Sequence, residues 1–130
     1  MKRTYECGQD SNVIKLSFQI GTVGVPFTKI FIVRSGGQRT EIKTSTKSRI
    51  PMFSIGQSEN LKNSYLIIRT LVNLSSLTVD KRKDEIENMK TRYNFKGGKS
   101  GAQTFSHDMD DIFTGLDEEI IEITKPIELI

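Results

Sequence analysis

Residues 14–20 alternate strictly between apolar and polar side chains, with the apolar ones at the even positions. A period of two places successive side chains on opposite faces of an extended strand, whereas an amphipathic helix repeats every ~3.6 residues. The pattern predicts a β-strand with one face in the core and the other in solvent. The chain also has a single alanine, the best helix former, beside abundant isoleucine and threonine, which favour strands.

Further strands are predicted between turns rich in glycine and proline. Residues 27–34 are apolar on both faces, which predicts a central strand. Gly36 and Gly37 supply the positive φ of a hairpin turn, so residues 39–47 are expected to return beside that strand as an exposed edge. Residues 65–79 are the most apolar region and are predicted as a strand, with a buried helix as the alternative, because short apolar runs do not distinguish the two.

Two short helices are predicted at residues 80–92 and 108–114, each capped by the aspartate at its start. Together with six to eight short strands they predict a mainly β fold, either a β-sandwich or an open barrel. An α+β domain with one antiparallel sheet is the alternative. We expect residues 1–130 to form one domain with a loose N-terminus at 1–11. The predicted core residues are Ile14, Leu16, Phe18, Ile30, Ile32, Leu66, Ile68 and Val72.

Charge is distributed unevenly along the chain. Residues 1–106 contain 18 Lys and Arg against 8 Asp and Glu, whereas residues 107–130 contain 1 against 8. Such an asymmetry is informative about partners rather than about fold.

Two groups of basic residues are candidates for binding anions. The first group lies in the predicted edge strand and the turn after it. It is predicted to contact phosphate along that edge and consists of Arg39, Lys43, Lys47 and Arg49. The alternative is that these side chains only protect the edge from aggregation. A glycine loop at 97–101 could contact an anion through Lys96 and Lys99, but the phosphate-binding-loop pattern fails at Tyr93, where that pattern requires glycine.

The sequence contains few residues whose type and spacing are typical of catalytic or metal-binding sites. His107, Asp108, Asp110 and Asp111 are close in sequence, but their spacing favours capping of a helix N-terminus over a metal site. His107 is the only histidine and has no nucleophile positioned beside it by a known motif. Cys7 is the only cysteine, so no disulfide can form within the chain. We therefore predict no catalytic, cofactor or metal residues, and a protein that is not an enzyme.

The acidic C-terminal segment, residues 117–130, also alternates apolar and polar residues. Its apolar content is too high for a solvated tail, and Pro126, which has no N–H to donate, predicts an edge strand. The segment is expected either to fold back on its own basic body or to add to the sheet of a neighbouring subunit. The candidate interaction residues in it are Glu118, Glu119, Glu122, Ile123, Ile127 and Leu129.

These features favour a non-enzymatic structural or protein-interaction subunit of a larger assembly, such as a virus particle, a tail-like structure or a secretion apparatus. The expected partner is another copy of the chain or another subunit. A nucleic-acid-binding module using the basic body is one alternative, and a ligand or carbohydrate module is another, although the chain has no tryptophan for stacking on sugars. No signal peptide or membrane-spanning segment is recognised, so we expect cytoplasmic synthesis without export and no membrane partner.

Overall fold

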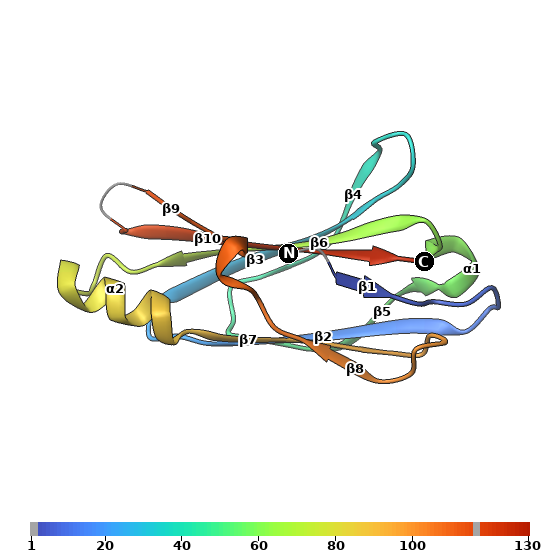
Figure 1. The fold of residues 1–130 in the computed structure, drawn as a ribbon, viewed down its shortest axis with the longest axis horizontal. Coiled ribbons are helices and arrows are strands. Elements are labelled where there is room, and N and C mark those ends of the chain that lie inside the picture. Colours follow the sequence, from blue (N-terminus) through green and yellow to red (C-terminus); the bar gives the residue numbers. More distant parts are fainter. Residues whose placement is uncertain (1–2, 116–117) are drawn as a thin grey trace.

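Two stacked β-sheets make up the computed structural model, which describes residues 3–115 and 118–130 (Figure 1). Sheet A has the order β1-β10-β6-β3-β4, and β9 also pairs with β10; sheet B has the order β5-β2-β7-β8. The strands of sheet A are β1 (Arg3–Tyr5), β3 (Val25–Val33), β4 (Arg39–Ser45), β6 (Ser64–Asn73), β9 (Ile112–Thr114) and β10 (Ile120–Leu129). Those of sheet B are β2 (Val13–Gly21), β5 (Arg49–Gln57), β7 (Lys90–Lys96) and β8 (Gln103–Phe105).

The core lies between the two sheets and is built by side chains at alternate strand positions. All eight predicted core residues are buried, at 3% exposure or less. They belong to one apolar cluster to which both sheets contribute. The mainly β fold predicted from the sequence is confirmed as a sandwich, and residues 65–73 are strand rather than helix. Three of the ten described strands have only three residues, too few to show a periodic pattern, and this accounts for the excess over the predicted six to eight.

The two helices lie at opposite ends of the sandwich (Figure 1). Helix α2 (Val79–Asn88) begins after Thr78, whose side chain makes no capping hydrogen bond, so the predicted cap Asp80 lies in its first turn. The helix stops before the predicted end at residue 92, because residues 90–96 continue as β7. Helix α1 (Ser58–Leu61) connects β5 to β6. The helix predicted at 108–114 is wrong in extent: only a 3₁₀ turn, η1 (Met109–Asp111), forms there before β9 begins.

Strand β10 is not an edge strand, contrary to the prediction from Pro126. It pairs along its full length with β6 on one side, while on its other side β9 covers residues 121–123 and β1 covers residues 127–129. The N–H and C=O of Ile130 face β1, so by alternation the nitrogen of Pro126 also faces that side. Pro126 therefore occupies the gap between β9 and β1, where no strand among the described residues requires its N–H.

Residues 3–7 are packed against the rest of the fold, which corrects the prediction of a loose N-terminus for that part of residues 1–11. Strand β1 runs parallel to β10, and both Tyr5 and Cys7 are buried. The Ile130 N–H donates to the Tyr5 carbonyl at 3.0 Å, and the Cys7 N–H donates to the Ile130 carbonyl at 2.7 Å. We call residues 3–7 the N-terminal clasp. The segment is too short for a sequence pattern to reveal, and long-range contacts alone hold it.

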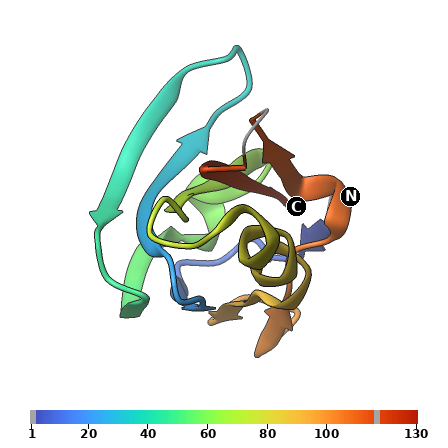
Figure 2. The same ribbon diagram turned by 90° about the vertical axis from the view of Figure 1, so that its left-hand side faces the viewer.

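Each edge of the two sheets has a feature that discourages pairing with another strand. Figure 2 shows β4 on the opposite side of the sandwich from the chain ends. Strand β4 has a bulge where it pairs with β3, β5 has two irregularities and contains Pro51, and β1, β8 and β9 have three residues each. Bulges, proline and short strands are the usual protections of sheet edges. Separately, none of the described helices is long and apolar enough to span a membrane.

Candidate functional site

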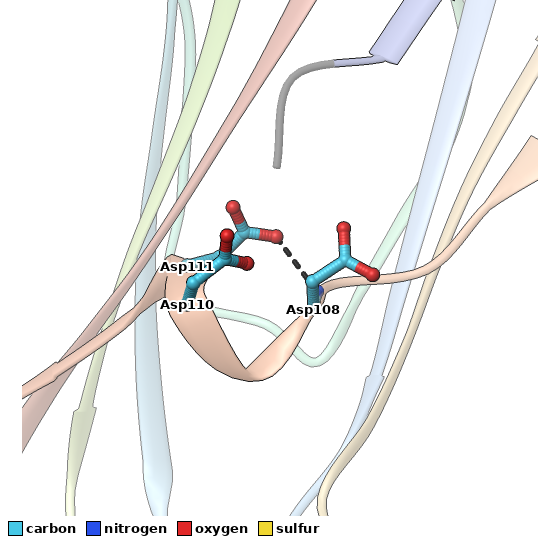
Figure 3. A group of neighbouring side chains, drawn as sticks. All are labelled: Asp108, Asp110 and Asp111. Carbon is cyan, nitrogen blue, oxygen red and sulfur yellow. Dashed lines mark hydrogen bonds between the residues drawn. The ribbon is translucent and has the colours of Figure 1, made fainter.

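Three carboxylates converge at η1, where the sequence places its acidic cluster (Figure 3). The Asp111 side chain accepts a hydrogen bond from the Asp108 N–H at 2.7 Å, and the two residues form a reciprocal capping box around the turn. Lys125, fully buried on the inner face of β10, lies 2.8 Å from Asp108 and 3.0 Å from Asp111 through its Nζ. A side-chain cation thus already occupies the position between these two carboxylates. The arrangement supports the predicted capping role and joins sheet A to η1.

The charged partners alter the acid–base properties of this region. The hydrogen bond from Lys125 is the main reason that the pKa of Asp108 lies below its usual value, and Arg3, 3.3 Å away, acts in the same direction. Burial lowers the pKa of His107, whose Nδ1 lies 2.6 Å from the Thr91 hydroxyl. Thr91 also accepts a hydrogen bond from the His107 N–H at 2.8 Å, so one threonine hydroxyl contacts both the backbone and the ring of His107.

The glycine loop at 97–101 is occupied by the chain itself. Its amides donate to the N-terminal clasp: Gly98 to the Tyr5 hydroxyl at 3.0 Å, Lys99 to the Cys7 carbonyl at 3.1 Å and Ser100 to the Glu6 carbonyl at 3.0 Å. These donors are the ones that an anion-binding loop would present. The Lys99 ammonium lies 3.3 Å from Glu6, so of the two predicted lysines only Lys96 lacks a carboxylate partner among the described residues.

Two glycines of this loop, Gly97 and Gly98, are required by close packing. A Cβ added to Gly97 would lie 2.0 Å from the carbonyl oxygen of Val13, and one added to Gly98 would lie 2.6 Å from the Tyr5 ring. The loop composition that suggested phosphate binding is thus explained by the approach of two backbones.

The predicted basic edge is not one surface. Arg39 lies over the Phe31 ring at 4.2 Å on the outer face of sheet A, whereas Lys43 lies over the Phe53 ring of β5 at 5.2 Å. The β4 bulge between these two positions puts their side chains on opposite faces. Lys47 lies in the connection after β4, and Arg49 begins β5 in the other sheet. These four residues therefore do not form one contiguous surface, and phosphate contact through them stays a prediction.

The candidate residues of the acidic segment divide into two groups. Ile123, Ile127 and Leu129 are fully buried in the core of this chain, so the prediction that they contact another subunit is wrong. Glu122 is half-buried and accepts a hydrogen bond from Arg69 at 2.5 Å. Glu118, which has a φ of 56°, and Glu119 lie before β10 near the surface. Asp117, the first residue of the segment, is outside the described residues.

The outer face of sheet A is unusually apolar for a surface. By register, Phe113 of β9, Glu122 of β10, Leu71 of β6 and Phe27 of β3 form one row across four strands. The side chains of Phe27 and Tyr65 are 36% exposed and those of Ile120, Val25 and Phe113 more so. No described helix lies over this face in either view (Figures 1 and 2). We define the apolar face by its outward residues, which are Val25, Phe27, Phe31, Tyr65, Ile67, Leu71, Phe113 and Ile120.

The outer face of sheet B has the opposite character. Its four strands contain no Asp or Glu, and their basic residues all point outward and are exposed. We define this basic face by Lys15, Arg49, Lys90, Arg92 and Lys96. Sequence reasoning singled out only Arg49 and Lys96 of these. Lys90 and Arg92 could have been found from the alternation of residues 90–96, and Lys15 from that of residues 14–20.

No protein family, curated protein or solved structure matches the chain in the three comparisons made. The two faces and the buried ion cluster must therefore be interpreted from their own chemistry.

Proposed function

We propose that the protein is a non-enzymatic structural subunit that associates with further copies of itself through the apolar face of sheet A. The observation that carries the proposal is the run of partly exposed apolar side chains across β9, β10, β6 and β3, over which no described element packs. Apolar patches of this extent on a soluble domain generally mark an interaction surface.

Charge on the same face favours a second copy as the partner. Strands β3, β4, β6 and β10 present three outward basic residues, Lys29, Arg39 and Arg69, and three outward acidic residues, Glu41, Glu122 and Glu128. A face with equal numbers of both signs does not repel its own copy and can form new pairs across an isologous contact. A purely acidic or purely basic partner would form fewer favourable ion pairs with this face than a second copy would.

A small hollow on this face provides a place for an anchoring side chain. It has a volume of about 100 Å³ and is lined by Phe27, Lys29, Arg69 and Leu71. Interfaces concentrate their binding energy where one apolar side chain fills such a pocket. Association by face also fits the edges, because β10 is interior and the outer strands are bulged or short. An assembly of repeated copies, such as a particle or a tail-like tube, is the kind of structure that this contact would build.

The test is sedimentation equilibrium of the full chain over a range of concentrations. We expect a reversible oligomer that is weakened in Phe27→Asp and Val25→Asp, because both changes bury a carboxylate in the contact. Met52→Asp, an exposed position in sheet B, is the matched control and should leave the oligomer intact, and circular dichroism should show that all variants are folded. A protein that is monomeric at its highest soluble concentration would contradict the proposal.

A further inference from the structure

The basic face of sheet B is the clearest electrostatic feature of the molecule. Its five cationic side chains lie on a surface whose strands contain no acidic residue. Among the described residues none of the five lies within ion-pair distance of a carboxylate, whereas Lys29, Arg69 and Lys99 each do. Five of the 18 basic residues of residues 1–106 therefore lie on one face of the sandwich whose strands offer no acidic compensation.

The pairing of Lys15 with Lys96 is an independent sign that this face binds an anion. The two lysines are directly opposite each other on β2 and β7. Like charges at such a position destabilise a sheet, because the side chains lie close together on the same face. No neighbouring strand residue of sheet B offsets this repulsion. A bound polyanion would remove it.

The spacing of the charges fits a nucleic-acid duplex. Lys15 and Lys96 form one row, and Arg49, Gln19 and Arg92 form another row four residues along the strands. At about 3.4 Å per residue the rows are roughly 13 to 14 Å apart. The major groove of B-form DNA is about 12 Å wide, so the two rows can contact phosphates on its two sides.

On β2 and β7 the outward residues between the two rows are hydrogen-bonding rather than apolar. Asn94 donates to the Ser17 hydroxyl at 3.1 Å, and Thr104 donates to Asn94 at 2.8 Å. The aromatic residues of β2 and β7, which are Phe18, Tyr93 and Phe95, all face the core and are buried. Single-stranded nucleic acid is usually held by stacking bases on exposed aromatic rings. A protein partner would require an apolar centre, but the exposed large apolar residues of sheet B are limited to Val13 and Met52.

We propose that the outer face of sheet B binds the phosphate backbone of double-stranded nucleic acid without reading its sequence. The contact is made by Lys15, Arg49, Arg92 and Lys96, with Lys90 at the end of the face. This inference is independent of self-association, since the apolar face lies on the other side of the sandwich.

The test is fluorescence anisotropy of a labelled random-sequence DNA duplex titrated with the full chain at several salt concentrations. Each phosphate contact contributes about −0.9 to the slope of log K against log salt. Four to five contacts predict a slope near −4 and a loss of affinity of about 10² to 10³ between 50 and 200 mM salt. Exchange of the duplex sequence should change the affinity little, because phosphate contacts carry no sequence information.

The variant Lys15→Gln with Lys96→Gln separates a specific face from general basicity. It should reduce the slope by about 2 and weaken binding, while the melting temperature is unchanged or higher because the repulsion is gone. Lys81→Gln with Lys83→Gln, which removes two exposed lysines from α2, is the matched control and should have a smaller effect. Equal loss in both double variants would overturn the proposal. So would tighter binding to single-stranded DNA, to poly-glutamate or to phosphatidylserine vesicles than to the duplex.

Discussion

Substitution of Tyr5 tests whether the N-terminal clasp is part of the fold. The Tyr5 ring is fully buried and stacks on Phe95 with a centroid distance of 5.0 Å. Its hydroxyl accepts from the Gly98 N–H at 3.0 Å and donates to the Gly101 carbonyl at 2.6 Å. The side chain therefore joins β1 both to the core and to the loop between β7 and β8.

The expected magnitude follows from these contacts. Tyr5→Phe keeps the ring and loses two hydrogen bonds, each contributing about 0.5 to 1.5 kcal/mol, so the free energy of unfolding should fall by about 1 to 3 kcal/mol. Tyr5→Ala also removes the ring, and large-to-small changes of buried aromatic residues cost about 3 to 5 kcal/mol. Because small domains are stable by only about 5 to 15 kcal/mol, the alanine variant should lose a large part of the total.

Urea unfolding followed by circular dichroism measures both values. Tyr65→Ala is the control, because Tyr65 lies on the outer face of sheet A and is 36% exposed; its effect on the monomer should be clearly smaller. If Tyr5→Ala changes the free energy of unfolding by less than about 1 kcal/mol, the clasp is not packed as described and the loose N-terminus expected from sequence is right.

Two further outcomes are expected. Lys125→Met should lower the free energy of unfolding by about 3 to 5 kcal/mol, because it removes a buried ammonium from Asp108 and Asp111. The control Lys29→Met breaks an exposed ion pair and should cost under about 1 kcal/mol. Equal losses of the two variants in urea unfolding would refute the distinction between a buried and an exposed pair. Burial raises the pKa of the Cys7 thiol from 9.0 to about 11, so the folded state holds that proton more tightly than the unfolded state does. The resulting contribution to the free energy of unfolding is complete below pH 9 and is lost as the pH rises toward 11. Cys7→Ser should therefore show a flatter decline of stability over this pH range than the parent protein, and an identical decline would count against a buried thiol.

The core of this fold could be predicted from sequence because it depends on local alternation. Residues 14–20 show a period of two, and their even-numbered side chains are all buried. Residues 90–96 carry the same signal, but the adjacent charged segment predicts a helix that continues to residue 92. In the structure the helix stops at Asn88, and Tyr93 and Phe95 face the core.

Features that depend on distant partners could not be predicted. Proline indicates an edge strand because it has no N–H to pair with a neighbouring strand. Here β9 and β1 leave a gap on one side of β10 at Pro126, so an interior strand can contain it. The charge asymmetry is visible in the sequence, but the gathering of five basic residues on one face of sheet B is not. Lys15 and Lys96 become neighbours only when β2 pairs with β7. Ile127, by contrast, was recognised as too apolar for a solvated tail, and it is buried in this chain's own core.

The parallel pairing of β1 with β10 has a consequence for how the chain acquires its structure. Arg3 lies opposite Ile127, so β1 can pair only after the much later residues of β10 have been synthesised. Contacts of such sequence separation carry a large loop-closure entropy and slow the folding reaction. On a ribosome the N-terminal residues, with the buried tyrosine and thiol among them, would emerge early and stay exposed until residues 120–129 had left the exit tunnel. Sheet A can thus close only after synthesis of β10, and the clasp is expected to be among the last parts of the molecule to gain protection from hydrogen exchange.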